Sequence, residues 1–142
     1  MPVIDSATAA RIRNLTANAP FMQTLGMRIT EIGRGWVTSE ITIDPTVHHQ
    51  QNGYIHAGVQ ASLADHSAGC AAATLVDENV IVLTIEFKVN LLRPAIGELL
   101  ICRAEVLRGG RNVTVVESSV WVVRDEAQKL VSKATVTIAN VK

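Results

Sequence analysis

The chain has 142 residues, of which 48% are hydrophobic, so its length and composition favour one domain with an ordinary hydrophobic core. Lys and Arg total 13, as do Asp and Glu, which makes the formal net charge zero. A nucleic-acid partner or an anionic membrane usually demands a basic excess, so we expect neither. The two cysteines, Cys70 and Cys102, lie in apolar runs without metal-ligand spacing, which predicts buried thiols in a reduced compartment.

The chain starts Met1-Pro2-Val3-Ile4-Asp5, which lacks both the basic region and the continuous apolar region of a signal peptide. The most apolar long stretch, residues 54–76, contains polar side chains that argue against a membrane span, namely His56, Gln60, Asp65 and His66. We therefore expect a cytoplasmic protein.

We treat residues 1–142 as a single domain that begins with a helical segment over residues 1–20, where apolar side chains recur at helical spacing before Pro20. Residues 27–32 and 36–43 predict two strands around a glycine-rich turn. A polar loop at 48–53 separates these strands from the next helix.

Residues 55–76 predict a long central helix whose side chains are small and apolar nearly all round. Such a helix is expected to be buried on every side, and small side chains let other backbones approach closely. A sheet that curls around the helix would provide this cover.

Residues 80–140 predict a four-strand meander. Every odd residue over 81–91 is apolar, so we expect one buried face and one wetter face, with Thr84 turned away from the buried one. Gly109-Gly110 predicts a hairpin because both residues tolerate positive φ, and a turn follows at residues 125–127.

The element order predicts an α+β fold: an antiparallel six-stranded sheet wrapped around a long central helix. Short connections make neighbouring strands antiparallel. One helix covers only one side of such a sheet, so we expect a partner subunit to cover the remaining surface.

Residues 52–59, Asn-Gly-Tyr-Ile-His-Ala-Gly-Val, and residues 63–65, Leu-Ala-Asp, carry a family resemblance. They resemble the PaaI-like (phenylacetic acid degradation) branch of the hotdog-fold thioesterases, whose pattern is Asn, Gly, His-Gly-Gly and then Leu-Ala-Asp on the helix. The resemblance continues over residues 84–90 and 92–95, and covers nearly the whole chain in element order. It implies a protein with a hotdog fold that hydrolyses acyl-CoA thioesters. It also implies that no metal or cofactor takes part, because coenzyme A is part of the substrate.

The resemblance also implies residue roles. Asp65 matches the acidic residue that activates water or attacks the thioester carbonyl, and Asn52 matches the loop amide that holds the carbonyl or the water. Ala57, where the family usually has Gly, matches the position whose N–H polarises the carbonyl. Thr84 matches a strand hydroxyl that assists the attacking group, from the subunit opposite Asn52. The branch also implies a homodimer with shared sites, and a dimer of dimers.

Spacing supports the shared site independently. The N–H groups of Ala57 and Gly58 begin the helix, where free donors and the helix dipole favour an oxyanion. Asp65 follows at i+8, about 12 Å along the axis. Two antiparallel copies of the helix would pair the donors of one copy with Asp65 of the other. His56 would hold the start of the helix through its side chain rather than act as a base.

Simpler roles stay open for three of these residues: Asp65 as a structural carboxylate, Asn52 as a turn residue, and Thr84 as an ordinary strand residue. Four basic residues are candidates for the phosphates of CoA, with solvated surface charge as the alternative: Lys88, Arg93, Arg108 and Arg111. The histidines match no zinc spacing, so we expect no metal.

Two other functions compete with hydrolysis of a small, aromatic or medium-chain acyl-CoA. A hotdog enoyl-CoA hydratase or dehydratase would need a carboxylate and a histidine that converge on the same water molecule. Asp65 and His66 are adjacent on a helix and diverge by about 100°. A non-catalytic acyl-CoA-binding module would have no need to retain both Asp65 and Asn52.

Overall fold

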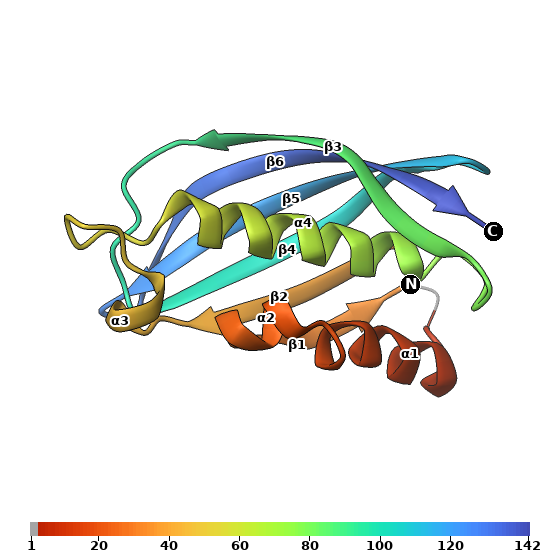
Figure 1. Ribbon diagram of the computed structural model, residues 1–142, viewed down its shortest axis with the longest axis horizontal. Coiled ribbons are helices and arrows are strands. Elements are labelled where there is room, and N and C mark those ends of the chain that lie inside the picture. Colours follow the sequence, from red (N-terminus) through yellow and green to blue (C-terminus); the bar gives the residue numbers. More distant parts are fainter. Residues whose placement is uncertain (1–2) are drawn as a thin grey trace.

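A computed structural model describes residues 3–142 (Figure 1). Six strands form one antiparallel sheet in the order β1-β2-β4-β5-β6-β3. The helices are α1 (Ser6–Ala17), α2 (Pro20–Leu25), α3 (Pro45–His48) and α4 (Ala57–Ala73). The strands are β1 (Met27–Gly33), β2 (Trp36–Thr42), β3 (Ile81–Leu91), β4 (Leu99–Gly109), β5 (Val113–Arg124) and β6 (Ala127–Val141).

The sheet curls around α4, which lies along its concave face (Figure 1). Buried hydrogen bonds hold the helix to the central strands: Ser39 Oγ and Ser67 Oγ lie 2.7 Å apart, and Ser118 Oγ donates to the carbonyl of Ala64 at 2.8 Å. Alternate residues of β2, β4, β5 and β6 point inward and are fully buried against α4. The α+β hotdog arrangement expected from the sequence is confirmed.

The expected four-strand meander over residues 80–140 is wrong in its first strand. Strand β3 pairs with β6 at one edge of the sheet, whereas β4 lies between β2 and β5. The meander therefore comprises β4, β5 and β6 only. Alternation of apolar and polar residues assigns the two faces of a strand, but it does not select the strand's neighbours.

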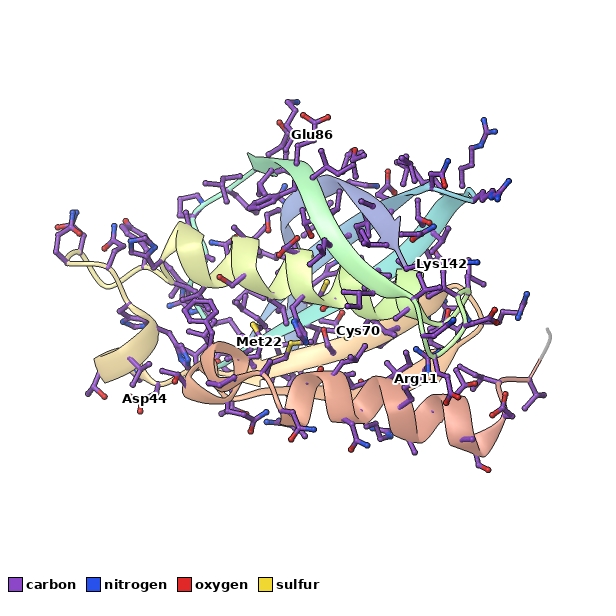
Figure 2. The ribbon with its side chains drawn as sticks, turned by 45° about the vertical axis from the view of Figure 1, so that its right-hand side comes forward. Arg11, Met22, Asp44, Cys70, Glu86 and Lys142 are labelled. Atoms are coloured by element: carbon purple, nitrogen blue, oxygen red, sulfur yellow. The ribbon has the colours of Figure 1, made fainter. Side chains whose placement is uncertain are left out.

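The helices depart from their expected limits. The expected helical segment 1–20, of which residues 1–2 lie outside the described part, continues as α2 to Leu25, because Pro20 occupies the first turn of a new helix. Helix α4 is shorter than the expected 55–76. Its C-terminal end is closed by Arg11 of α1, whose Nη2 donates to the carbonyls of Ala73 and Val76 (Figure 2).

A β-bulge reverses the faces of β3 half-way along the strand. Thr84 pairs with the fully buried Ile138, but Glu86 pairs with the next β6 residue, Thr137, so Ile85 is an extra residue. Thr84 therefore faces α4, and Glu86 points away from it (Figure 2). The expectation that all odd residues share one face, with Thr84 turned away, is wrong because the bulge adds one residue to the alternation.

Much apolar surface of β3 and α4 stays uncovered. Ile81, Leu83 and Ile85 are 60%, 55% and 58% exposed on an edge strand. On α4, Ala57 is exposed, and residues at every fourth position after it are half-buried: Ala61, Asp65 and Gly69. Within one chain, the expectation that α4 is buried on every side is thus wrong for the stripe formed by these four residues.

Both expected turns form, but the glycines of the first do not act as expected. The β4–β5 hairpin forms, but neither Gly109 nor Gly110 has positive φ. Glycine is required at position 110 because a Cβ there would lie 2.4 Å from the carbonyl oxygen of Val113. The β5–β6 turn places Asp125 and Glu126 at φ values of 49° and 68°. No helix within residues 3–142 is long and apolar enough to cross a membrane.

Candidate active site

A groove of about 700 Å³ opens at the N-terminal end of α4. Three segments form its walls: the loop before α4, the first turn of α4, and the end of β3 with the residues that follow it. The lining residues are Gln50, Tyr54, Ile55, His56, Ala57, Gln60 and Leu91 to Ala95. The groove is therefore the place where the N-terminal end of the helix meets an open, largely apolar surface.

His56 is the N-cap of α4. Its Nδ1 accepts a hydrogen bond from the N–H of Gly58 at 2.8 Å. Of the two backbone donors expected at this end, the N–H of Gly58 is therefore already used. The N–H of Ala57 has no acceptor within residues 3–142, and it lies at the positive end of the helix dipole.

The loop before α4 presents a side-chain amide to the groove, but it belongs to Gln50 rather than Asn52. Gln50 Oε1 accepts hydrogen bonds from the backbone N–H groups of Asn52 and Tyr54. This fixes the carbonyl end of the amide and leaves Nε2 as a donor. Asn52 is exposed at the tip of the loop, next to Gly53 with φ of 82°, and does not line the groove.

Asp65 and Thr84 form a hydrogen-bonded pair outside the groove. Thr84 Oγ1 donates to Asp65 Oδ1 at 2.7 Å, because the inner face of β3 passes over the middle of α4. Asp65 lies eight residues after Ala57, a rise of about 12 Å along the helix. Within one chain the carboxylate and the free N–H therefore cannot contact the same carbonyl group.

Residues 52–127 match the family model described as the thioesterase superfamily. The chain belongs to this superfamily. A 1,4-dihydroxy-2-naphthoyl-CoA hydrolase from Listeria monocytogenes is 31% identical over 117 residues, covering 82% of this chain and 92% of the relative.

Solved structures agree with this assignment. A thioesterase family protein from Silicibacter pomeroyi is 37% identical with a TM-score of 0.91, covering 94% of this chain and 98% of that one. The PaaI protein of E. coli shares the fold, with a TM-score of 0.82 at 19% identity and 96% coverage of each chain. The protein is an enzyme of the thioester hydrolase class.

His66 of this thioesterase is turned toward α1. Its Nε2 lies 3.0 Å from Thr16 Oγ1, whereas the neighbouring Asp65 is bonded to Thr84 of β3. The two side chains therefore have separate partners on different elements and do not converge on one water. Burial lowers the pKa of His66, and the negative charge of Asp65 opposes this effect only in part.

The expected phosphate-binding residues of the thioesterase lie in three places. Arg93 lines the groove, and its Nη1 donates to the carbonyl of Leu130. Lys88 is exposed on β3, where its Nζ bonds Asn90 Oδ1 at 3.2 Å. Arg108 and Arg111 lie at the β4–β5 hairpin, near the residues that follow the C-terminal end of α4. Only Arg93 is at the groove of its own chain.

Other histidine side chains also serve the fold. His48 is buried; its Nδ1 accepts from the N–H of Asp44, and its Nε2 lies 2.8 Å from the carbonyl oxygen of Leu25. Across residues 3–142, no group of three or more His, Cys, Asp or Glu residues is placed to hold a metal ion.

The lowered pKa of His66 predicts a pH-dependent stability. Below the ordinary value of 6.5, the unfolded chain binds a proton at this position more readily than the native protein does. The free energy of unfolding should therefore fall as the pH drops below 6.5, by at most about 1.4 kcal/mol per pH unit for one proton. In urea unfolding between pH 7.5 and 5.5, His66→Gln should show a shallower fall than the wild type. Equal slopes would contradict this role of His66.

Proposed function

We propose that this thioesterase hydrolyses an acyl-CoA at a site built by two copies of the chain. The observation that carries the proposal is the Thr84–Asp65 pair, which lies on the uncovered stripe of α4 and eight residues beyond the free N–H of Ala57. In an antiparallel pair of α4 helices, the groove of one copy would face the Asp65 of the other.

The chemistry follows from these positions. The thioester carbonyl would accept hydrogen bonds from the N–H of Ala57 and from Nε2 of Gln50, which stabilise the oxyanion that forms during attack. Asp65 of the second copy would take the proton of an attacking water, or attack the carbonyl itself. Thr84 Oγ1 holds one carboxylate oxygen of Asp65 and thereby orients the other. The products are the carboxylic acid and the thiol of CoA.

The uncovered surfaces support the pairing of two copies. The stripe on α4 consists of small residues and allows a second helix to approach closely. Strand β3 is an unpaired edge of eleven residues with exposed apolar side chains, and proteins normally cover such an edge. We propose a homodimer in which both features are buried. The family resemblance extends this proposal to a dimer of dimers.

The groove suits a small aromatic or medium-chain acyl group. Its walls are mainly apolar, formed by Ile55, Leu91, Leu92 and Pro94, and the Listeria relative is named for an aromatic acyl-CoA. The methyl group of Ala57, where the family usually has glycine, narrows the approach to the backbone. A CoA substrate and two buried thiols fit a cytoplasmic enzyme.

Arg93 is the residue best placed to bind CoA phosphates, because it lines the groove of its own chain. Arg108 and Arg111 lie at the opposite end of α4, so they could reach the groove only from a second, antiparallel copy. Lys88 lies two residues after Glu86 and on the same side of the bulge. Its side chain therefore points outward from β3, as that of Glu86 does.

The structure gives less support to the competing functions. A hydratase or dehydratase would need a histidine beside Asp65, but His66 contacts Thr16 instead. A non-catalytic acyl-CoA-binding module would have no use for a carboxylate held by Thr84 on an uncovered surface.

The first test replaces the proposed catalytic groups. Asp65→Asn should lower kcat by about 10²–10⁴-fold, because it removes the basicity of the carboxylate and keeps its shape. Gln50→Ala should lower kcat less than Asp65→Asn does, because the N–H of Ala57 remains as a donor to the oxyanion. Release of the CoA thiol from a panel of acyl-CoAs measures both. Asn52→Ala is the matched control, since this amide lies outside the groove, and it should change kcat little. Near-normal turnover by Asp65→Asn would refute the mechanism.

The second test blocks the pairing of two copies. A Cβ at Gly69 would meet no atom within 4 Å, so Gly69→Lys should leave the isolated subunit folded. It should convert the dimer into an inactive monomer, because an unpaired charge in an apolar contact is costly. Light scattering and turnover measure the two effects. Ala10→Lys, at an exposed position of α1, is the control. A stable dimer of Gly69→Lys, or an active monomer, would contradict the shared site.

A further inference from the structure

The wall of the groove contains a buried acceptor without a partner. Gln60 is one turn further along α4 than Ala57 and only 4% exposed. Its Oε1 has no hydrogen-bond partner within residues 3–142. Buried polar atoms are nearly always paired, and an unpaired one destabilises the fold, so this atom requires an explanation.

The free atom is the oxygen of the amide and not its nitrogen. Gln60 Nε2 lies 3.4 Å from the carbonyl oxygen of Ile55, a long hydrogen bond. Exchanging the two ends of the amide would place two acceptors against each other and leave the NH₂ group unpaired. Because the last torsion of a glutamine side chain is broad and the bond to Ile55 is long, the oxygen can turn into the groove at little cost.

Resting on the proposed function, we propose that Gln60 is a specificity-determining residue whose Oε1 accepts a hydrogen bond from a hydroxyl group on the acyl part of the substrate. The N–H of Ala57 fixes the thioester carbonyl at the mouth, where Tyr54 and His56 are exposed. The long, polar CoA moiety leaves through this mouth toward solvent. Gln60 is buried and one turn deeper, on the side that receives the acyl group.

The test compares benzoyl-CoA with its 2-, 3- and 4-hydroxy derivatives. For the wild type, kcat/KM for at least one hydroxybenzoyl-CoA should exceed that for benzoyl-CoA by about tenfold, the value of one good hydrogen bond. In Gln60→Leu this ratio should fall to about twofold or less, and the melting temperature should not drop, because an unpaired buried acceptor is removed. If Gln60→Leu does not fold, Gln60→Met gives the same comparison.

Gln23→Leu is the matched control. This glutamine is in α2, donates to the carbonyl of Thr16 at 2.8 Å, and lies outside the groove, so the substrate ratio should stay at its wild-type value. A fall in the ratio for Gln23→Leu as large as that for Gln60→Leu would overturn the inference.

Two other outcomes would also overturn it. If Gln60→Leu lowers kcat/KM equally for benzoyl-CoA and its hydroxy derivatives, the partner of Oε1 is an amide N–H of the pantetheine arm. If the wild type has no hydroxyl preference, Gln60 does not select the acyl group. The proposed function still stands in that case, provided that Asp65→Asn abolishes hydrolysis of benzoyl-CoA.

If no acyl-CoA is hydrolysed, the proposed function fails. The role of Gln60 is then tested by the affinity of the protein for non-hydrolysable acyl-CoA analogues. Calorimetry with the amide-linked analogues of benzoyl-CoA and hydroxybenzoyl-CoA should then show the same tenfold preference, lost in Gln60→Leu. Equal affinities would overturn the inference about Gln60.

Discussion

The rise of one α-helix constrains the whole site. The free N–H of Ala57 begins α4, and the carboxylate of Asp65 follows eight residues later on the same uncovered stripe, about 12 Å away. A single carbonyl group cannot contact both. The small residues along the stripe and the unpaired edge of β3 are the surfaces on which a second, antiparallel copy could pack and bring the two groups together.

The sheet provides a hydrogen-bond partner for Asp65 that helix α4 alone cannot provide. The bulge at Ile85 turns Thr84 inward, and this places its hydroxyl 2.7 Å from the carboxylate of Asp65. At the other end, the side chain of His56 accepts a hydrogen bond from the N–H of Gly58, and the N–H of Ala57 stays free. Two backbone N–H groups of the loop donate to Oε1 of Gln50 and fix its amide. Each end of the site is thus held by its own local hydrogen bonds before any partner binds.

The sequence predicted what depends on local patterns. The central helix, Asp65 on it and the cap at His56 follow from composition, spacing and family resemblance. The bulge was missed because one extra residue leaves the alternation of β3 unbroken in the sequence. The position of Gln50 was missed because two amides stand two residues apart in one loop, and only the folded loop shows that Gln50 lines the groove. The role of Gln60 depends on a missing partner, which no sequence pattern reveals.

The shared site is tested most directly by mixing two variants with lowered activity. Subunits carrying Asp65→Asn and subunits carrying Gln50→Ala should form mixed dimers with one intact site. Random mixing should then restore about a quarter of wild-type activity, because half of the dimers are mixed and each has one working site of two. A mixture of Asp65→Asn and Thr84→Ala subunits should restore no activity. Each site takes both Asp65 and Thr84 from one subunit, so each site of this mixed dimer carries one of the two substitutions. If mixed dimers of the first pair form, as shown by native mass spectrometry, and no activity returns, the two-subunit site is contradicted.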